Sequence, residues 1–444
     1  MTEAPIAEAR PRISLEDLRD AWLLLDPEDR VFGFRSLDPA EADDFFLSLS
    51  TRDQRDLVLH LPAGERRIWL RILPPDDAAD LLQDVPEEER AEMLAQLDQA
   101  TQNDVRALLA YAEDDAGGLM NPRYARVRPE MSAEEAISYI RRQLKEQPGS
   151  LNYAYVLDAD QHLLGVVSFR QLFGMTPEQK IRDLMRTDLI TVPETMDQEE
   201  VSRLFARHHL LAIPVLDERG RMKGVVTADD IVEVVREEAT EDIQKIGGTA
   251  VLGAPYLQVG ILGMIRRRAG WLSALFLGEM LTATAMTYFQ NEIAKAVVLA
   301  LFVPLVISSG GNSGSQATTL VIRAMALGEL RLRDWWRVIR REFFSGLGLG
   351  LILGTIGVLR IVTWQSIFHT YGSHGIVVAI TVGLSLVGVV LWGTLSGSVL
   401  PFLLKRLGFD PASASAPFVA TFVDVTGLII YFTTARMIMK GTLL

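Results

Sequence analysis

The chain has 444 residues, a formal net charge of −13 and no cysteine, so disulfides, thiolate metal sites and cysteine nucleophiles are excluded. Its charge is unevenly distributed, because residues 1–250 carry 50 acidic and 29 basic side chains, whereas residues 251–444 carry 7 and 15. This asymmetry predicts an acidic soluble half and a membrane half with basic flanks, and it argues against nucleic acid as a partner.

Residues 1–119 predict an acidic, all-α domain. The stretches "LPAGERRIWLRI" from Leu61 and "VPEEERAEMLAQ" from Val85 lie 24 positions apart. In each, a proline after an apolar residue is followed by acids and then by periodic apolar residues, which indicates successive helix starts. This repetition favours a small helical solenoid. Between the two stretches, Asp76, Asp77 and Asp80 give it an acidic surface.

An internal repeat follows the solenoid. "YVLDADQHLLGVVSFRQL" from Tyr155 recurs as "PVLDERGRMKGVVTADDI" from Pro214, 59 positions later. Each copy predicts a strand, a tight turn, a second strand and a helix capped by Ser or Thr. With upstream partners that start at Met120 and Met185, two β-α-β-β-α units are expected. They resemble a pair of cystathionine-β-synthase-type (CBS) domains, which are regulatory and commonly bind adenosine nucleotides or metal ions.

The stretch "ADDIVEVVREEATEDIQKIGG" predicts a helix between the soluble and membrane halves. Asp230, Glu233, Glu237 and Glu241 recur at spacings of 3, 4 and 4, so they share one face. Like charges at these spacings cost roughly 0.2–0.5 kcal/mol per pair. A solvated acidic face is the simple interpretation. The alternative is a divalent cation that bridges this face to a second acidic surface, such as the solenoid or the "DQEE" stretch at 197–200.

Apolar stretches long enough to cross a bilayer recur in the second half of the chain. Basic residues gather before the first stretch, between the second and third, and between the fourth and fifth. By the positive-inside rule, the N-terminus is inside and the C-terminus outside. The opening "MTEAPIAEAR" lacks the apolar core of a signal peptide, which agrees with this orientation. The five spans are expected at 269–289, 294–326, 343–364, 375–404 and 412–436.

Two carboxylates lie inside the expected spans, Glu279 and Asp424. An ionised Asp at mid-bilayer costs roughly 2.5–3.5 kcal/mol on insertion scales, so such a residue normally faces a protein interior or a water path. Asp424 is therefore a candidate pore residue, with Thr426 and the backbone at Gly427 beside it. For Glu279, a place on the ion path and a role as a hydrogen-bonded packing residue remain alternatives.

A second polar cluster, "SSGGNSGSQATTL" at 308–320, lies in the second expected span. Pro304 and the glycines are expected to bend or open this helix. Asn312 and Gln316 are four residues apart, so they share a face that either lines a path or forms hydrogen bonds between helices. Carboxylate, amide and carbonyl oxygens suit a hard, partly hydrated cation, and soft transition metals have no suitable ligands in the spans.

The chain as a whole resembles the MgtE-type magnesium channel/transporter family. The predicted fold is a multidomain membrane protein with an all-α solenoid N domain, tandem α/β CBS domains, a connecting helix and a five-span α-helical transmembrane domain. The domains are assigned to 1–119, 120–184, 185–236, 237–268 (the connecting, or plug, helix) and 269–444 (the pore). The motifs that carry the resemblance are "EDDAGGLMNP" at 113–122, the CBS pair, "EEATEDIQKIGG" at 237–248, "GGNSGSQATTLVIRA" at 310–324, "LRDWWRV" at 332–338 and "DPASASAPFVATFVDVTGLIIYF" at 410–432.

The resemblance implies a homodimer in the plasma (inner) membrane with its pore at the subunit interface. Asp424 would select hydrated Mg²⁺, and the backbone carbonyls of Ala420 and Gly427 would hold the water shell of the ion. Internal Mg²⁺ would bridge the acidic faces of the soluble domains and close the pore. The matching positions are Asp197, Glu199, Asp229, Asp230, Glu238, Glu241 and Asp242, together with Asp77 and Asp80.

Two features depart from the family pattern. His208 and His209 stand where an acidic residue is expected, so one sensing ligand is missing or depends on pH, since histidine is the residue type whose charge changes near neutral pH. Glu279 is not general to the family. A channel for another divalent cation (Co²⁺, Mn²⁺ or Ca²⁺) and a carrier coupled to protons or Na⁺ therefore remain alternatives.

No enzymatic activity is expected, although two kinds of intramembrane protease have partial sequence counterparts here. "GNSG" at 311–314 is similar to the sequence around the serine of rhomboid-type proteases, with Ser313 as nucleophile and His369 or His374 as base. Glu279 and Asp424 would form the acid pair of an aspartyl protease. Whether a nucleotide binds the CBS pair stays open.

Overall fold

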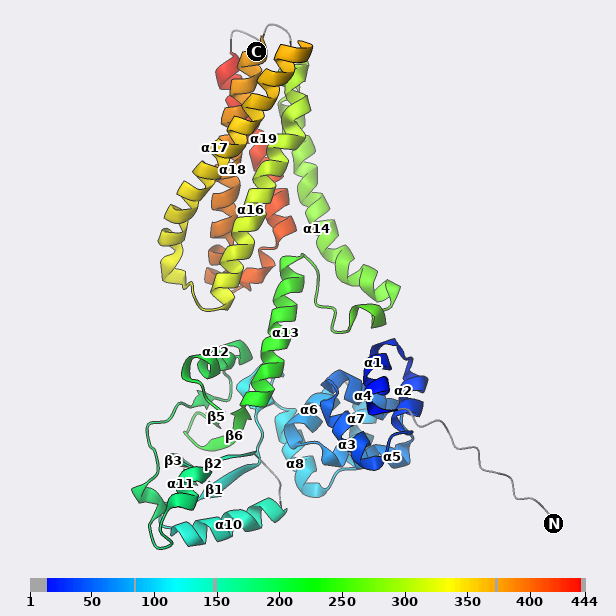
Figure 1. Ribbon diagram of the computed structural model, residues 1–444, viewed down its shortest axis with the longest axis vertical. Coiled ribbons are helices and arrows are strands. Elements are labelled where there is room, and N and C mark those ends of the chain that lie inside the picture. Colours follow the sequence, from blue (N-terminus) through cyan, green and yellow to red (C-terminus); the bar gives the residue numbers. More distant parts are fainter. Residues whose placement is uncertain (1–13, 84, 147–149, 372–373, 441–444) are drawn as a thin grey trace, which may run out of the picture. The chain divides into compact units, whose positions relative to one another are not determined.

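The computed structural model describes residues 14–83, 85–146, 150–371 and 374–440 (Figure 1). The chain divides into two compact units, Met1–Arg236 and Glu237–Leu444. One helix, α13 (Ala228–Ile246), crosses the division. Each unit is described by itself.

The first unit begins with a series of short helices, as the sequence predicts. Several start at a side chain that accepts a hydrogen bond from the first turn, such as Ser14, Asp26 and Ser50. These caps satisfy backbone N–H groups that have no partner inside the helix. The helices are α1 (Leu15–Ala21), α2 (Pro27–Phe34), α3 (Pro39–Ser48), α4 (Thr51–His60), α5 (Ala63–Ile72), α6 (Pro75–Gln83), α7 (Glu87–Leu94) and α8 (Gln99–Leu108).

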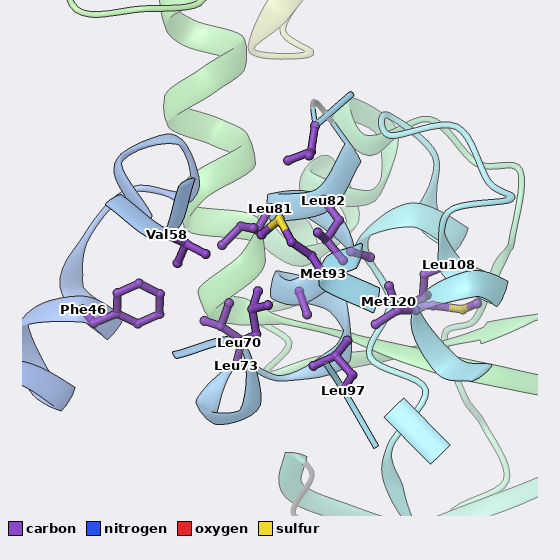
Figure 2. Close-up of a cluster of buried hydrophobic side chains, with 14 of the residues drawn as sticks. Phe46, Val58, Leu70, Leu73, Leu81, Leu82, Met93, Leu97, Leu108 and Met120 are labelled. Carbon is purple, nitrogen blue, oxygen red and sulfur yellow. The ribbon is translucent and has the colours of Figure 1, made fainter. Parts of the chain in front are cut away.

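Successive helices of the solenoid bury their apolar faces in one core. Figure 2 shows Phe46, Val58, Leu70, Leu81 and Met93 gathered in this core, and they come from α3, α4, α5, α6 and α7 in turn. All five side chains are fully buried. Full burial of a side chain of this size contributes about 1.5–3 kcal/mol, so the core fixes the direction in which α6 presents its acids.

Two three-stranded sheets form the CBS pair. In each sheet the first strand runs parallel to the second, and the second is antiparallel to the third. This is the β-α-β-β-α order that the repeat predicts. The first copy comprises β1 (Tyr124–Val127), α10 (Ala133–Glu146), β2 (Ser150–Leu157), β3 (Leu163–Ser168) and α11 (Phe169–Gly174), and the second comprises β4 (Val192–Pro193), α12 (Gln198–His208), β5 (Ala212–Leu216), β6 (Met222–Thr227) and α13.

The motif at 113–122 forms the junction between the solenoid and the second CBS copy. Its glycines lie in α9 (Ala116–Leu119) and are buried. The backbone N–H of Gly117 donates to the carbonyl of Glu194 at 2.8 Å, and a Cβ atom there would overlap the ring of Tyr111. A Cβ atom on Gly118 would overlap the carbonyl of Ala112. The close approach of these backbones therefore requires glycine.

Among its described residues, the second unit contains five helices long and apolar enough to cross a membrane, which confirms the predicted number of spans. Four of them, α16 to α19, run side by side, whereas α14 packs mainly on α19 (Figure 1). The five helices are α14 (Ile261–Tyr288), α16 (Val303–Ala326), α17 (Trp335–Phe368), α18 (Gly375–Arg406) and α19 (Ala416–Met439), and the short helix α15 (Gln290–Lys295) lies between the first two in the chain.

Several helix bounds differ from the prediction. The chain over 237–268 is not one helix, because α13 ends at Ile246 and α14 begins at Ile261. The first and third membrane helices begin several residues earlier than expected, so that α14 includes Arg266, Arg267 and Arg268 and α17 includes Arg337, Arg340 and Arg341. The expected opening near Pro304 is wrong: Pro304 lies in the first turn of α16, which continues unbroken to Ala326. Proline is tolerated there because no intrahelical hydrogen bond is lost.

Glycines set the contact between α16 and α18. Gly310 and Gly314 on α16 face Gly393 and Gly397 on α18, each pair four residues apart. A Cβ atom on Gly393 would overlap the carbonyl oxygen of Gly310, and one on Gly397 would overlap that of Gly314. Small residues at this spacing allow the backbones of membrane helices to approach closely.

Replacing Gly393 with Ala is expected to destabilise the membrane unit, because the new methyl group forces two backbones apart. Overpacking of this kind typically costs about 1–3 kcal/mol. Thermal unfolding in detergent is the measurement. Gly348→Ala on α17 is the matched control, because a Cβ atom there meets open space and the change favours the helix. Equal melting temperatures for the two variants would contradict the prediction.

Candidate metal sites

The first candidate site surrounds Asp424, in the middle of α19. Asp424 is partly buried, and among the described residues it has no hydrogen-bond partner. A Cβ atom built on Gly311 of α16 would lie 3.6 Å from Oδ1 of Asp424 and 3.5 Å from Cα of Ala420. The carboxylate therefore lies where α16 and α19 cross. A carboxylate without a protein partner in a membrane helix calls for water or a cation beside it.

A polar stripe runs along α16 next to this crossing. Ser308, Asn312, Gln316 and Thr319 recur at spacings of 4, 4 and 3, and all four are exposed on the surface of the chain. The predicted pair Asn312 and Gln316 thus shares a face. Exposed amides in a membrane helix normally face water or another protein surface, because lipid does not satisfy their hydrogen bonds.

The other residues predicted near Asp424 lie on an unbroken helix, since α19 is continuous from Ala416 to Met439. The hydroxyl of Thr426 accepts a hydrogen bond from Nε1 of Trp392 at 2.8 Å and donates to the carbonyl of Phe422 at 2.8 Å. Gly427 is buried, and a Cβ atom there would lie 2.9 Å from the Cγ1 atom of Val389. Both residues therefore contact α18, and their contact with an ion stays a prediction.

Glu279 lies on α14 and is exposed. Its neighbour Gly278 packs on α19, where an added Cβ atom would lie 3.3 Å from Cγ2 of Thr421. Glu279 therefore lies beside the helix that carries Asp424, about one turn from it along α19. Two carboxylates in one region of a membrane protein favour a cation or a proton nearby.

The hydroxyl of Ser313 lies 2.6 Å from that of Thr394 on α18, a contact in which either group donates. This is a hydrogen bond between packed helices, not the contact with a histidine that a serine nucleophile needs.

The second candidate site lies in the first unit, where α6 meets the start of α13. Carboxylate oxygens of Asp76, Asp77 and Asp230 lie within 4.8 Å of one another. Asp76 is buried and accepts a hydrogen bond from Nδ2 of Asn121 at 3.0 Å. Asp230 accepts from the backbone N–H and the hydroxyl of Thr227, at 2.9 and 2.6 Å. Three carboxylates this close together suit a hard divalent cation.

Burial and mutual repulsion make the charged forms of these carboxyl groups unfavourable without a cation. Burial, then the nearby charge of Asp230, raises the pKa of Asp77 to about 6. Burial also raises the pKa of Asp230 to about 6, against the hydrogen bonds from Thr227. The pKa values of Asp76 and Asp80 lie well above the usual range because both carboxyls are buried among other acids. A divalent cation would remove this penalty at neutral pH.

The remaining predicted ligands divide between several places. Asp229 and Glu233 lie close enough to Asp77 to raise its pKa. Asp197 caps α12 and accepts from the backbone N–H of Glu199 at 2.9 Å, and Glu199 forms an ion pair with Arg203. Three others, Glu238, Glu241 and Asp242, lie on the part of α13 that belongs to the second unit. His208 and His209 are exposed at the end of α12. They stand where the family pattern has an acidic residue.

The end of α13 is fixed to the membrane helices. Nζ of Lys245 lies 2.6 Å from Oδ2 of Asp410 and also pairs with Glu241. Burial lowers the pKa of Lys245, but these hydrogen bonds outweigh burial and raise it overall, so the side chain is charged. Ile246 packs against Ala412 and Ala414, just before the N-terminus of α19.

A glycine and a tryptophan complete this junction. Gly248 has a φ of +70°, and a Cβ atom there would lie 2.8 Å from the ring of Trp271. Nε1 of Trp271 in turn donates to Oγ of Ser415 at 3.2 Å, and Ser415 is the N-cap of α19. Displacement of the end of α13 would therefore act on the helix that carries Asp424.

Comparison with known proteins finds matches over most of the chain. Family models match at residues 13–114 (MgtE intracellular N domain), 116–175 and 181–237 (CBS domain) and 303–434 (divalent cation transporter). The magnesium transporter MgtE of Thermus thermophilus is 41% identical over 345 residues, which are 78% of this chain and 74% of that protein. That of Bacillus subtilis is 34% identical over 336 residues, 74% and 70% of the two chains.

A solved structure described as the cytosolic domain of the Mg²⁺ channel MgtE in complex with ATP is 36% identical. It covers 50% of this chain and 90% of its own, with a TM-score of 0.46.

Proposed function

Because the chain belongs to the MgtE family of magnesium transporters, we propose that it is a Mg²⁺ channel gated by internal Mg²⁺. Ions would pass Asp424 through a pore, and Mg²⁺ bound to the acidic soluble domains would close it. The observation that carries this proposal is the carboxylate of Asp424 in a membrane helix, without a hydrogen bond among the described residues and next to an exposed polar stripe. Since the stripe faces out of the chain, we propose that a second copy covers it and that the pore lies between the two.

The ion is proposed to stay largely hydrated in this pore. Mg²⁺ gives up its waters reluctantly and is usually bound through one or two carboxylates and several waters. Asp424 would supply the charge, while Asn312, Gln316 and the carbonyls of Ala420 and Gly427 would contact the water shell. Two charges crossing 100 mV gain roughly 4.6 kcal/mol, so the membrane potential of the plasma membrane drives uptake.

Gating is proposed to combine the two sites. Without Mg²⁺, the acids of α6 and α13 repel one another, and with Mg²⁺ they are bridged. The contacts of Lys245, Ile246 and Gly248 would transmit this change to the start of α19. In this scheme the N domain is 1–119, the CBS domains are 120–184 and 185–236, the connecting segment is 237–268 and the pore is 269–444. Binding of an adenosine nucleotide to the CBS pair stays a prediction from its resemblance to other such pairs.

Recordings from excised membrane patches test the proposal. Removal of Mg²⁺ from the cytoplasmic side is expected to open a Mg²⁺-conducting channel, and millimolar Mg²⁺ is expected to close it. Competition with Co²⁺, Mn²⁺ and Ca²⁺ in the same patches measures ion preference. A patch that conducts no divalent cation in either condition would contradict the proposal.

A coupled carrier is the second candidate, and the position of Glu279 near Asp424 favours it, because two carboxylates in one membrane site can exchange a proton for a cation. In vesicles, such a carrier would move Mg²⁺ in response to a proton gradient at zero potential, and Glu279→Gln would remove the response. A channel would show no such response.

A further inference from the structure

A groove of about 500 Å³ lies between α17 and α18 at the basic end of the membrane helices. Its walls are apolar and include Trp335, Ile339, Phe402 and Leu403. Arg333, just before α17, and Arg406, the last residue of α18, line the same groove. The apolar walls match the acyl chain of a phospholipid, and the two guanidinium groups match its phosphate.

The two arginines carry charge that the protein does not neutralise. Among the described residues, neither Arg333 nor Arg406 forms an ion pair or a hydrogen bond. The nearby acid Asp334 is occupied, because it pairs with Arg337 at 3.2 Å and accepts from the backbone N–H of Arg331. The groove is lined by no acidic side chain in the part of the chain that the structure describes. Its positive charge therefore complements an anion.

The composition of the groove and of its surroundings identifies the class of anion. Trp335 and Trp336 are half or more exposed at the start of α17, and tryptophan favours the level of the lipid headgroups. Phe402 and Leu403 lie on the apolar side of Arg406, in the part of α18 that continues without a charged residue back to Gly375. A free phosphate would satisfy the arginines but leave the apolar walls open. Basic pockets between membrane helices on the cytoplasmic side are typical sites of anionic lipid headgroups.

We propose that this groove binds an anionic phospholipid. The phosphate lies between Arg333 and Arg406, and one acyl chain lies along Ile339, Phe402 and Leu403. Planar guanidinium groups recognise phosphate oxygens in pairs, which lysine does less well. The site requires only that the helices span a membrane, so it does not depend on the proposed ion pathway.

Native mass spectrometry of the full chain with phosphatidylglycerol or phosphatidylcholine of identical acyl chains tests the site. The wild type is expected to retain phosphatidylglycerol preferentially. In Arg333→Gln/Arg406→Gln, occupancy by phosphatidylglycerol is expected to fall at least about fivefold, because two charged hydrogen-bond donors are lost. The control Arg340→Gln/Arg341→Gln removes the same charge from α17 outside the groove, and a change below about twofold is expected.

A second variant tests the acyl-chain half of the site. Leu403 is 48% exposed and lines the groove, so Leu403→Trp is expected to fill it and reduce binding of both lipids while the arginines remain. Unchanged lipid binding in both groove variants would overturn the proposal, and it is the outcome expected if another protein copy covers the groove. Equal losses in the groove pair and the control pair, or displacement of phosphatidylglycerol by millimolar inorganic phosphate, would also overturn it.

Discussion

Replacing Asp424 with Ala is expected to abolish Mg²⁺ influx. A dication about 5 Å from a carboxylate gains roughly 7 kcal/mol at an effective dielectric constant of 20, and roughly 2 kcal/mol in bulk water. Even the smaller value corresponds to about thirtyfold in rate. Asp424→Asn keeps the shape of the side chain, so an equal loss in that variant would assign the effect to the charge.

Radiometric or fluorescent Mg²⁺ uptake into proteoliposomes measures this loss. Thr355→Ala is the matched control, because the Thr355 hydroxyl lies on the exposed face of α17 and donates only to a carbonyl of its own helix. The control is expected to transport like the wild type. Wild-type uptake by Asp424→Asn would contradict the assignment of Asp424 as the residue that attracts the ion.

The number of membrane helices could be predicted from the sequence because apolar stretches report directly on lipid exposure. Their ends could not. The segment with Arg266, Arg267 and Arg268 is helical, since α14 begins at Ile261. Hydropathy measures only the part of a helix that lies in hydrocarbon, and a helix that continues into the headgroup region keeps its hydrogen bonds among charged residues. The same reason explains the early start of α17.

The candidate sites were predicted in part, and the limit was tertiary contact. The spacing of acids on α13 pointed to Asp230, but its buried neighbour Asp76 and the amide of Asn121 come from other elements, 154 and 109 positions away in the chain. No local pattern shows which of three acids on α6 points inward. In the sequence, Gly311 likewise cannot be distinguished from the other glycines of its helix. Only the crossing of α16 and α19 places it beside Asp424.

Asp77→Asn is expected to leave the pore open at internal Mg²⁺ concentrations that close the wild type. Asp77 is the simplest acid of the cluster to interpret, because its pKa is shifted only by burial and by neighbouring charges. Its loss removes one of the proposed charged ligands, and a tenfold increase in the Mg²⁺ needed for closure requires only about 1.4 kcal/mol. Inside-out patches over a series of Mg²⁺ concentrations measure the shift, with the exposed Glu88→Gln on α7 as the control of equal charge.

The same variant is expected to melt at a higher temperature than the wild type when no metal is present. The pKa of Asp77 is raised to about 6 in the folded protein, whereas the pKa of an Asp in an unfolded chain is near 4. Ionisation of Asp77 therefore opposes folding above about pH 4, and this free-energy penalty grows until about pH 6. At pH 7.5 it amounts to the order of 1–3 kcal/mol. The gain should therefore be full at pH 7.5, shrink near pH 4.5 and disappear when Mg²⁺ stabilises the wild type. A variant less stable than the wild type at pH 7.5 without metal would contradict the prediction that burial and the neighbouring acids penalise the charge of Asp77.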